Sequence, residues 1–549
     1  MTGTLVRGLR GAVVAPHHLA TTAGLAILRA GGSAVDAAIA TNAVLAVVQP
    51  QHCGIGGDAF WLIWDQAAGR QVALNGSGRS AASIDSAALR ARGHDRVPFR
   101  GPLSITVPGA VRSWGDAHAR YGRLTRDAIL APAIELARGG IAASTAFIGA
   151  VEGFAAIAEA LGEAGHGFAS VLRPHGRAWR PGEHVRFPAL ASTLETLARD
   201  GFDAFYEGDL ADGQARTLGA LGSPITVDDL RAHRSTWGEP ISLDYRGVRV
   251  TTHPPNSSGI VALTLLGILA QLEAPEPSAF GERGVRDARW IHLGLEAAKL
   301  AMADRDAHLT DPEARDIPIE TLLHRARLAA LAAMIDPDHA AQPVPATNPP
   351  GGDTVYMATV DAAGNAVSLI ESNWAGFGSG VVDPDSGVHY QNRGSFFSLD
   401  PGHANVLAPR KRTLHTLLPG MLFRAGQAAP WIVVGSMGGD VQPQIHAQFV
   451  SAVVDGGLDI GTAVAAPRWS VEPPELLTPP TEVHLEPRHE PGIAEALRAR
   501  GHDLHPTAAF DDALGHEHAI ELVDGGPARP DGSLAATTDP RSEGLPALW

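Results

Sequence analysis

The sequence predicts an α+β protein built as a layered sandwich. Along its 549 residues, a mostly helical part comes first, strand-like runs follow a Pro/Gly-rich segment, and strands with flanking helices come last. This order differs from the regular strand–helix alternation of a doubly wound parallel sheet. The length also exceeds the size at which one hydrophobic core stops growing, so we expect two lobes or one large, elaborated sandwich.

The N-terminal part predicts two helices followed by two short strands. Gly31 and Gly32 form a common helix stop. Ser33 stands three residues before Asp36, which is the spacing of a capping box at the start of an Ala-rich run. Pro50 ends that run, and a glycine-rich turn follows. The predicted elements are helices over residues 19–30 and 34–48 and strands over residues 59–64 and 71–75.

The middle of the chain, roughly residues 105–345, predicts mainly helices. Residues 290–304 are a clear example, because their apolar residues recur at helical spacing. Residues 341–352, with the sequence AQPVPATNPPGG, cannot continue a helix or a central strand. We therefore expect a linker there.

Strand signals begin directly after this linker. Residues 354–360 and 366–372 are strand-like and are separated by a short turn, so they predict a hairpin. Residues 431–434 predict a short buried strand that runs into a glycine-rich turn. A helix is expected from about residue 441, with Pro443 in its first turn.

Composition excludes several classes of partner. Lys and Arg number 43 against 59 Asp and Glu, and the net charge of −16 argues against nucleic acid or an anionic membrane. The apolar run at residues 11–16 is too short for a secretory signal, and the longest one, residues 260–272, is too short to span a bilayer. With a single cysteine no intramolecular disulfide can form, and we expect a cytoplasmic protein.

Three features invite a cofactor or metal interpretation but favour a simpler one. Residues 54–59, GIGGDA, have the letters of a dinucleotide fingerprint but follow a helix and open a strand, the reverse of the required order. The 24 histidines include no HExxH motif, and Cys53 lacks the local signature of a thiol enzyme and cannot build a Cys-based zinc site alone. We therefore expect no metal and no organic cofactor.

The segment Gly351-Gly352-Asp353-Thr354 is the strongest candidate site. Taken without its context, this segment is simply a loop that leads into a strand. A threonine at the start of a strand, behind flexible glycines, is also placed for its hydroxyl to attack the preceding carbonyl. Cleavage there yields an N-terminal threonine whose own α-amine can act as the base, so no histidine is needed to activate the hydroxyl.

A second glycine pair supplies the complementary group. Gly438 and Gly439 lie between the predicted buried strand and the following helix, where backbone N–H groups are free and the helix dipole is positive. Such donors form an oxyanion hole for acyl transfer, and one of them can be worth roughly 3–4 kcal/mol. The two segments together predict a self-cleaving amide hydrolase or acyltransferase.

On these motifs the chain resembles the γ-glutamyltransferase family of N-terminal-nucleophile (Ntn) hydrolases, nearly end to end. The resemblance rests on GLAILRAGGSAVDAAIATNAVLAVVQPQHCGIGGDAF, GDTVYMATVDAAGNAVSLIES, FGSGVV, SLDPGHANVLAPRKR, VVGSMGGDVQPQ, AVAAPRW and TTDPRSEG. It implies a four-layer αββα sandwich made as an inactive precursor. The precursor would be cut into a large chain, 1–353, and a small chain, 354–549, that stay paired.

The resemblance also implies roles for individual residues. Thr354 falls on the nucleophile, and the Asp353–Thr354 bond on the cleavage point. Ser372 falls on a hydroxyl that supports the nucleophile, and Gly438 and Gly439 fall on the oxyanion glycines. Arg79 falls on the arginine that grips the substrate carboxylate, a task that suits a bidentate guanidinium.

The sequence departs from the family where a glutamyl substrate is held. Three polar or acidic positions that bind its α-ammonium become Trp374, Arg393 and Phe396, none of which can accept a hydrogen bond from an ammonium. The paired serines for its carboxylate become His415 and Thr416, of which Thr416 can still donate. We therefore expect that carboxylate recognition is kept and ammonium recognition is lost.

Two further segments, NRGSFFSLDP and KRTLHTLLP, look like a branch of the family that includes oxamate amidohydrolase. The expected substrate is a small carboxylate-bearing amide, with Arg79 and Arg393 lining the pocket, although a structural salt bridge explains Arg393 equally well. One alternative is a γ-glutamyltransferase or glutathione hydrolase, and related members take other acyl groups, including cephalosporin side chains. Another alternative is an uncleaved, non-catalytic relative that binds a small acid or a partner protein.

Overall fold

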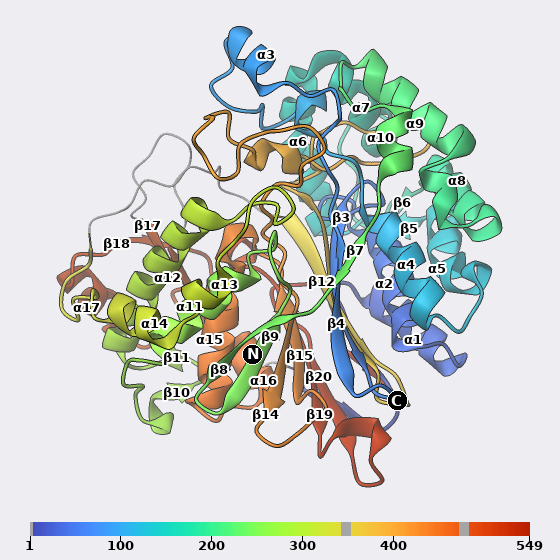
Figure 1. Cartoon of the computed structure of the whole chain (residues 1–549). Helices are drawn as coiled ribbons and strands as arrows, with labels where there is room; N and C mark the ends of the chain where they lie inside the picture. Colours follow the sequence, from blue (N-terminus) through green and yellow to red (C-terminus); the bar gives the residue numbers. More distant parts are fainter. Residues whose placement is uncertain (1–3, 342–352, 472–481) are drawn as a thin grey trace.

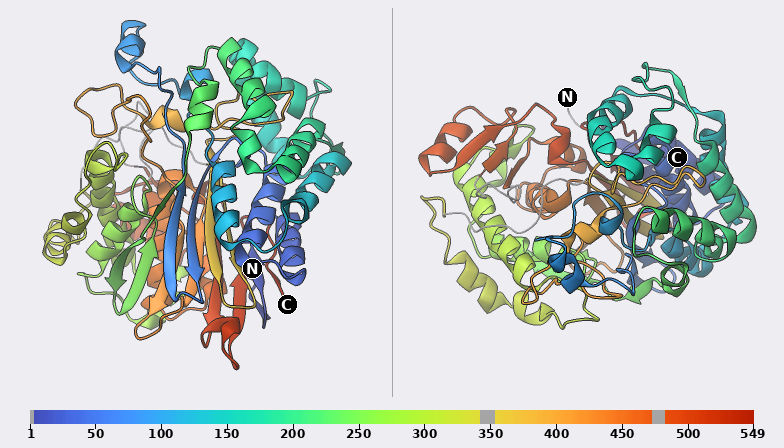
Figure 2. Two further views of the ribbon diagram at one scale, coloured as in Figure 1. Left: turned by 45° about the vertical axis from the view of Figure 1, so that its right-hand side comes forward. Right: turned by 90° about the horizontal axis from the view of Figure 1, so that it is seen from above.

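A computed structural model of the chain describes residues 4–341, 353–471 and 482–549. Two antiparallel sheets of seven strands each stack face to face at its centre. Helices cover the outer face of each sheet, so the layers run helix, sheet, sheet, helix (Figures 1 and 2). This architecture confirms the predicted αββα sandwich.

Both sheets mix strands from the two sides of Thr354. The β12 sheet contains, in spatial order, β21 (Ala547–Leu548), β2 (Ala12–Val14), β12 (Asp353–Val360), β13 (Ala366–Trp374), β3 (Asp58–Asp65), β4 (Arg70–Gly76) and β7 (Thr236–Gly238). The β15 sheet contains β1 (Val6–Gly8), β20 (Ser533–Thr537), β19 (Glu517–Val523), β15 (Ile432–Ser436), β14 (Gly420–Arg424), β9 (Val248–Thr252) and β8 (Ile241–Tyr245).

The helices divide between the two outer layers and the periphery. The layer beside the β12 sheet includes α1 (His18–Arg29), α2 (Ala34–Val48), α4 (Ala110–Tyr121), α5 (Arg126–Gly139) and α8 (Pro188–Asp200). The layer beside the β15 sheet includes α11 (Gly259–Leu269), α12 (Ala288–His308), α15 (Gln442–Val454) and α16 (Ile460–Ala465). The remaining elements are α3 (Ser86–Ala91), α6 (Thr145–Ala160), α7 (His166–Leu172), α9 (Gly208–Ala220), α10 (Val227–Ala232), α13 (Ile319–Leu322), α14 (Arg325–Ala332), α17 (Ile493–Ala499), β5 (Ile141–Ala142), β6 (His184–Val185), β10 (Phe280–Gly281), β11 (Gly284–Val285), β16 (Trp469–Val471), β17 (Glu482–Leu485) and β18 (Asp503–Pro506).

The side chains of β12 alternate between two hydrophobic cores, one on each face of its sheet. Tyr356 and Ala358 lie in the apolar core between the sheets. Val355 and Met357 lie in the core between the sheet and its helices. Thr354 Oγ1 bonds to Ser372 Oγ, and Ser372 shares the face of Ile370, which lies in the core between the sheets, so the Thr354 side chain also points between the sheets.

The local predictions near the N-terminus are confirmed. The capping box at the start of α2 is present, with Ser33 N donating to Asp36 at 2.9 Å and Asp36 N donating to Ser33 Oγ at 3.1 Å. The GIGGDA segment is a turn that opens β3, and Cys53 is buried.

The middle of the chain contains strands in addition to the predicted helices. The predicted hairpin is β12 and β13, and Pro443 lies in the first turn of α15, as expected. The middle of the chain is mainly helical but also contributes β7, β8 and β9 to the two large sheets, and the short strands β5, β6, β10 and β11, which its periodicity did not indicate. Most of the expected linker, residues 342–352, lies outside the described residues. Among the helices of the described ranges, none is long and apolar enough to cross a membrane.

Candidate active site

Thr354 lies in an irregularity at the start of β12. Asp353 pairs with Trp374 and Val355 pairs with Glu371, so two residues of β13 stand opposite Thr354 alone. Bulges of this kind often lie beside active sites, where they re-aim a side chain. Thr354 itself is completely buried.

The hydroxyl of Ser372 links Thr354 to its surroundings. Thr354 Oγ1 donates a hydrogen bond to Ser372 Oγ at 3.1 Å. The backbone N–H of Trp374 and Nη2 of Arg393 also donate to Ser372 Oγ, at 2.7 and 3.4 Å. The predicted nucleophile, its supporting hydroxyl and Arg393 therefore belong to one hydrogen-bonded group.

Arg393 is a buried cation in a 3₁₀ turn (Arg393–Phe396), with only 1% of its surface exposed. Its Nη1 donates to Thr416 Oγ1 at 3.2 Å, and its Nε has no partner. Within the described ranges, no carboxylate lies at ion-pairing distance from this guanidinium, and Asp58 and Asp440 act on it only from farther away. Burial lowers the pKa of Arg393 to about 9, so the guanidinium stays charged at neutral pH.

The three positions that depart from the family's ammonium site lie together. The guanidinium of Arg393 is 4.7 Å from the ring centroid of Trp374 and 5.2 Å from that of Phe396. The two aromatic rings are themselves 4.4 Å apart. The result is a cation in contact with two aromatic rings, and none of these three side chains can accept a hydrogen bond from an ammonium.

His415 makes a second buried polar contact next to Thr416. Its Nε2 is 3.2 Å from Oδ2 of Asp58. Burial raises the pKa of Asp58 to about 7, despite the nearby charge of Arg393. Burial, together with the charge of Arg393, holds the pKa of His415 well below its usual range. The imidazole is therefore neutral, and Asp58 changes charge near neutral pH.

Gly438 and Gly439 form the turn between β15 and α15. Their φ angles of 131° and 53° lie in the region that favours glycine. Contacts between the sheets, from Ser368 Oγ to Val434 O and from Tyr356 to Gly435, show that β15 runs opposite to β12.

The end of β15 therefore lies on the same side of the sandwich as the start of β12. This places the glycine turn and Thr354 toward one edge of the two sheets. The side-chain amide of Gln442, with its nitrogen facing acceptors, donates at 3.2 Å to the carbonyls of Ser436 and Thr416. That amide joins the glycine turn to the segment that contacts Arg393.

Two buried acids near this turn were missed by the sequence analysis. Asp440 follows Gly439 and forms an ion pair with Arg305 of α12 at 2.6 Å. Asp58 follows Gly57 and contacts His415. A signal was present, because both acids follow a glycine pair as Asp353 does. The sequence of Gly56-Gly57-Asp58 predicts only a turn, and the prediction of an oxyanion hole at Gly438 and Gly439 assigns no role to Asp440.

Arg79, unlike Arg393, forms ion pairs with carboxylates. Its Nη1 lies 3.1 Å from Oδ2 of Asp311, and its Nη2 lies 2.8 Å from Oε1 of Glu313. The preceding residue, Gly78, donates its N–H to Asp58 Oδ1 at 2.9 Å. Arg79 is thus one residue from the Asp58–His415 pair, while its guanidinium is bound by two carboxylates.

Comparison with known proteins identifies the family. The Gamma-glutamyltranspeptidase family model matches residues 20–549. The chain belongs to the γ-glutamyltranspeptidase family. This confirms the resemblance inferred from the motifs, and with it an enzyme of the Ntn-hydrolase class.

Individual relatives within the γ-glutamyltranspeptidase family span almost the whole chain. It is 40% identical over 546 residues to the oxamate amidohydrolase proenzyme of Klebsiella pneumoniae and 39% identical over 540 residues to the glutathione hydrolase-like YwrD proenzyme of Bacillus subtilis. Each alignment covers 98% of both proteins. Cephalosporin acylase from Bacillus halodurans has a similar structure, with a TM-score of 0.90, 38% identity, and coverage of 100% of this chain and 97% of that one. Both sequence relatives are named as proenzymes.

Proposed function

We propose that this family member is an autoprocessing amidohydrolase that acts on a small amide whose carboxylate lies beside the scissile carbonyl, as in oxamate. The Asp353–Thr354 bond breaks first, leaving the large chain 1–353 paired with the small chain 354–549. Thr354 then forms an acyl-enzyme that water hydrolyses. A cytoplasmic location stays a prediction from the sequence.

The chemistry follows from an N-terminal threonine. Its α-amine takes the hydroxyl proton, and Oγ1 attacks the amide carbonyl. The backbone N–H groups of Gly438 and Gly439 stabilise the oxyanion, while Ser372 orients the hydroxyl. The ammonium returns its proton to the leaving nitrogen, ammonia departs, and water activated by the same amine cleaves the ester.

The buried guanidinium of Arg393 carries the substrate assignment. Two hydrogen bonds, of 3.1 and 3.4 Å, connect Thr354 Oγ1 to Ser372 Oγ and then to Arg393 Nη2. In oxamate the carboxylate carbon is bonded directly to the amide carbon, so a carbonyl at Thr354 places the carboxylate beside Arg393. The α-carboxylate of a γ-glutamyl group is four bonds from its amide carbon and reaches much farther.

Thr416 and His415 complete the proposed carboxylate pocket. Thr416 Oγ1 already accepts from Arg393 and can donate its own proton to a substrate oxygen. His415 has an Nδ1 without a partner, and this nitrogen carries a proton that it can donate to a substrate oxygen when protonated Asp58 donates to Nε2. Arg79 remains a candidate from the resemblance, but it would first have to leave Asp311 and Glu313.

Processing is tested first, on a denaturing gel and by intact mass, with a Thr354→Ala variant beside the wild type. Two fragments in the wild type, the smaller beginning at Thr354, and an uncut variant support the proposal. A wild type that stays whole under all maturation conditions supports the non-catalytic alternative and removes the enzyme mechanism.

The substrate is tested on the processed protein. Ammonia release from oxamate is compared with aniline release from a γ-glutamyl anilide, with Thr354→Ala as the blank. We expect turnover of oxamate and little of the anilide. Faster turnover of the γ-glutamyl anilide than of oxamate would establish the γ-glutamyl alternative. Turnover of longer acyl amides alone would indicate a substrate class like that of a cephalosporin acylase.

A further inference from the structure

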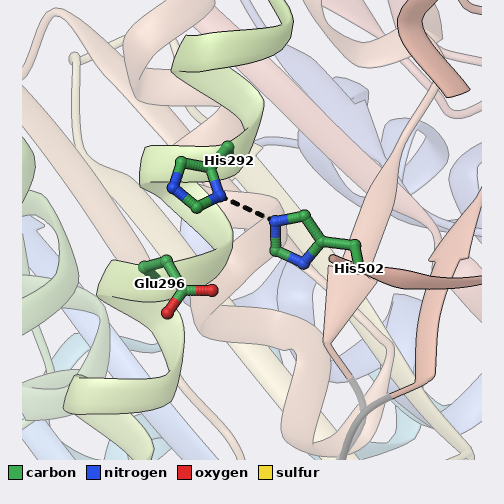
Figure 3. A group of neighbouring side chains, drawn as sticks. All are labelled: His292, Glu296 and His502. Atoms are coloured by element: carbon green, nitrogen blue, oxygen red, sulfur yellow. Dashed lines mark hydrogen bonds between the residues drawn. The ribbon is translucent and has the colours of Figure 1, made fainter. Parts of the chain in front are cut away.

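Three metal-ligating side chains meet well outside the candidate active site. His292 and Glu296 are one turn apart on α12, so they lie on the same helix face. His502 lies between α17 and β18. One ligand atom from each of the three lies within 4.8 Å of the others, and Figure 3 shows both imidazoles and the carboxylate turned toward one space.

The hydrogen bonds of His292 leave one of its nitrogens suited to a metal. Its Nε2 is 2.8 Å from the carbonyl oxygen of Asp336, which can only accept, so Nε2 carries the proton. Nδ1 therefore has the free lone pair, and it faces His502 Nε2 at 2.8 Å. An imidazole whose second N–H is fixed by a backbone carbonyl is the usual arrangement of a metal-bound histidine.

Burial and charge support the same conclusion. All three side chains are buried. Glu296 accepts from Lys299 at 2.6 Å on one oxygen and from Ala341 N at 3.1 Å on the other, which leaves a lone-pair position on each oxygen.

We propose that His292 Nδ1, His502 Nε2 and the Glu296 carboxylate bind one Zn²⁺ ion, with water as the fourth ligand. Tetrahedral zinc with Zn–N bonds of about 2.0–2.1 Å separates its ligand atoms by roughly 3.3 Å, so the two rings move apart by about half an ångström. His502 then carries its proton on Nδ1. This site departs from the expectation of a metal-free protein, which rested on the missing HExxH motif.

The position of the site gives it a structural role. His292 and Glu296 precede Thr354 in sequence and His502 follows it, so the ion joins the parts that become the large and small chains. The same cluster binds the backbone of Asp336 and Ala341, and Ala341 is the first residue of the expected linker. Zinc binding itself does not depend on processing or on the chemistry of Thr354.

The test is a Zn²⁺ titration of tag-free, chelator-stripped protein in competition with a chromophoric chelator. We expect one equivalent to bind to the wild type and equally to uncut Thr354→Ala, so the result is separate from the fate of the proposed function. His502→Ala should bind more than about 100-fold more weakly, because even outer-shell partners are worth 10–100-fold. His505→Ala, at a half-buried histidine on neighbouring β18, is the matched control and should bind normally.

A second measurement covers the case in which His502→Ala does not fold. Glu296→Gln keeps the size of the side chain and an acceptor for Ala341 N, but it removes the anionic ligand. Co²⁺ added to the wild type should give visible d–d bands of a tetrahedral site, and these should be lost in Glu296→Gln. Absence of tight binding to the wild type, or equal affinity and spectra in wild type and Glu296→Gln, would overturn the proposal.

Discussion

Nη2 of Arg393 lies 3.4 Å from Oγ of Ser372, the same oxygen that accepts a hydrogen bond from the hydroxyl of Thr354. A charged group and the predicted nucleophile thus share one hydrogen-bond acceptor. Because Arg393 lacks a carboxylate partner within the described ranges, an incoming anion would relieve the cost of its burial. In the proposed function, this shared acceptor would couple anion binding at Arg393 to attack by Thr354 on a neighbouring carbonyl.

Arg393→Met should weaken use of oxamate far more than Arg79→Met. A hydrogen bond to a charged group contributes about 1.5–3 kcal/mol, so kcat/KM should fall roughly 10- to 150-fold. Arg79 is already bound by Asp311 and Glu313, and its loss should cost less. Steady-state ammonia release measures both. A larger loss in Arg79→Met would place the carboxylate at Arg79, as the family resemblance implies.

Ser372→Ala should slow both self-cleavage and turnover by roughly 2- to 10-fold, because Thr354 loses a hydrogen bond worth about 0.5–1.5 kcal/mol. The rate of precursor disappearance on a gel and kcat per processed enzyme give the two values. Ser368→Ala is the control on the same strand, since Ser368 bonds to Tyr356 and Gly420 instead. Equal slowing in both variants would assign Ser372 a general role in the sheet.

The KM for oxamate should rise as the pH increases through 7. Burial raises the pKa of Asp58 from 3.8 to about 7, so the carboxyl becomes anionic in this range and opposes the positive field of Arg393. Its raised pKa also means that Asp58 contributes stability below about pH 4 that is lost as the pH rises through 7. Asp58→Asn should give a KM and a stability with less pH dependence. An unchanged profile in that variant would exclude Asp58 as the titrating group.

Gly435→Ala should destabilise the fold by about 1–3 kcal/mol, because a Cβ there would lie 2.2 Å from the ring of Tyr356 and force the sheets apart. Gly213→Ala on α9 meets open space and should stabilise by about 0.5–1 kcal/mol. Urea unfolding in the uncut Thr354→Ala background measures both on a single chain. A neutral Gly435→Ala would mean that the two sheets adjust easily at this contact.

Much of the fold could be predicted because its signals are local. The capping box of Ser33 and Asp36 and the turn between β12 and β13 depend on neighbouring residues only. The strands β7, β8 and β9 were missed because their burial depends on partners far along the chain, such as β14 beside β9. Periodicity within a segment does not contain that information.

The candidate site divides in the same way. Thr354, Gly438 and Gly439 could be predicted because their neighbours in sequence mark them. Thr354 begins a strand after two glycines, and Gly438 and Gly439 lie in a turn between a strand and a helix. Whether Arg393 makes a salt bridge could not be decided from the sequence, since the answer depends on which acids fold against it. The structure places Asp440 with Arg305 instead, and leaves Arg393 between two aromatic rings.

The strand order has a consequence for assembly. In the β12 sheet, β2 lies beside β12 and β3 beside β13, and in the β15 sheet β9 lies beside β14. The pieces 1–353 and 354–549 are therefore interlocked, and a cut before Thr354 would free an amine without freeing a domain. Only the uncut chain can reach this arrangement by a first-order reaction. A cleaved enzyme that unfolds would have to find its other half again, so the peptide bond proposed to break for activity would also be the bond that lets the two parts fold as one chain.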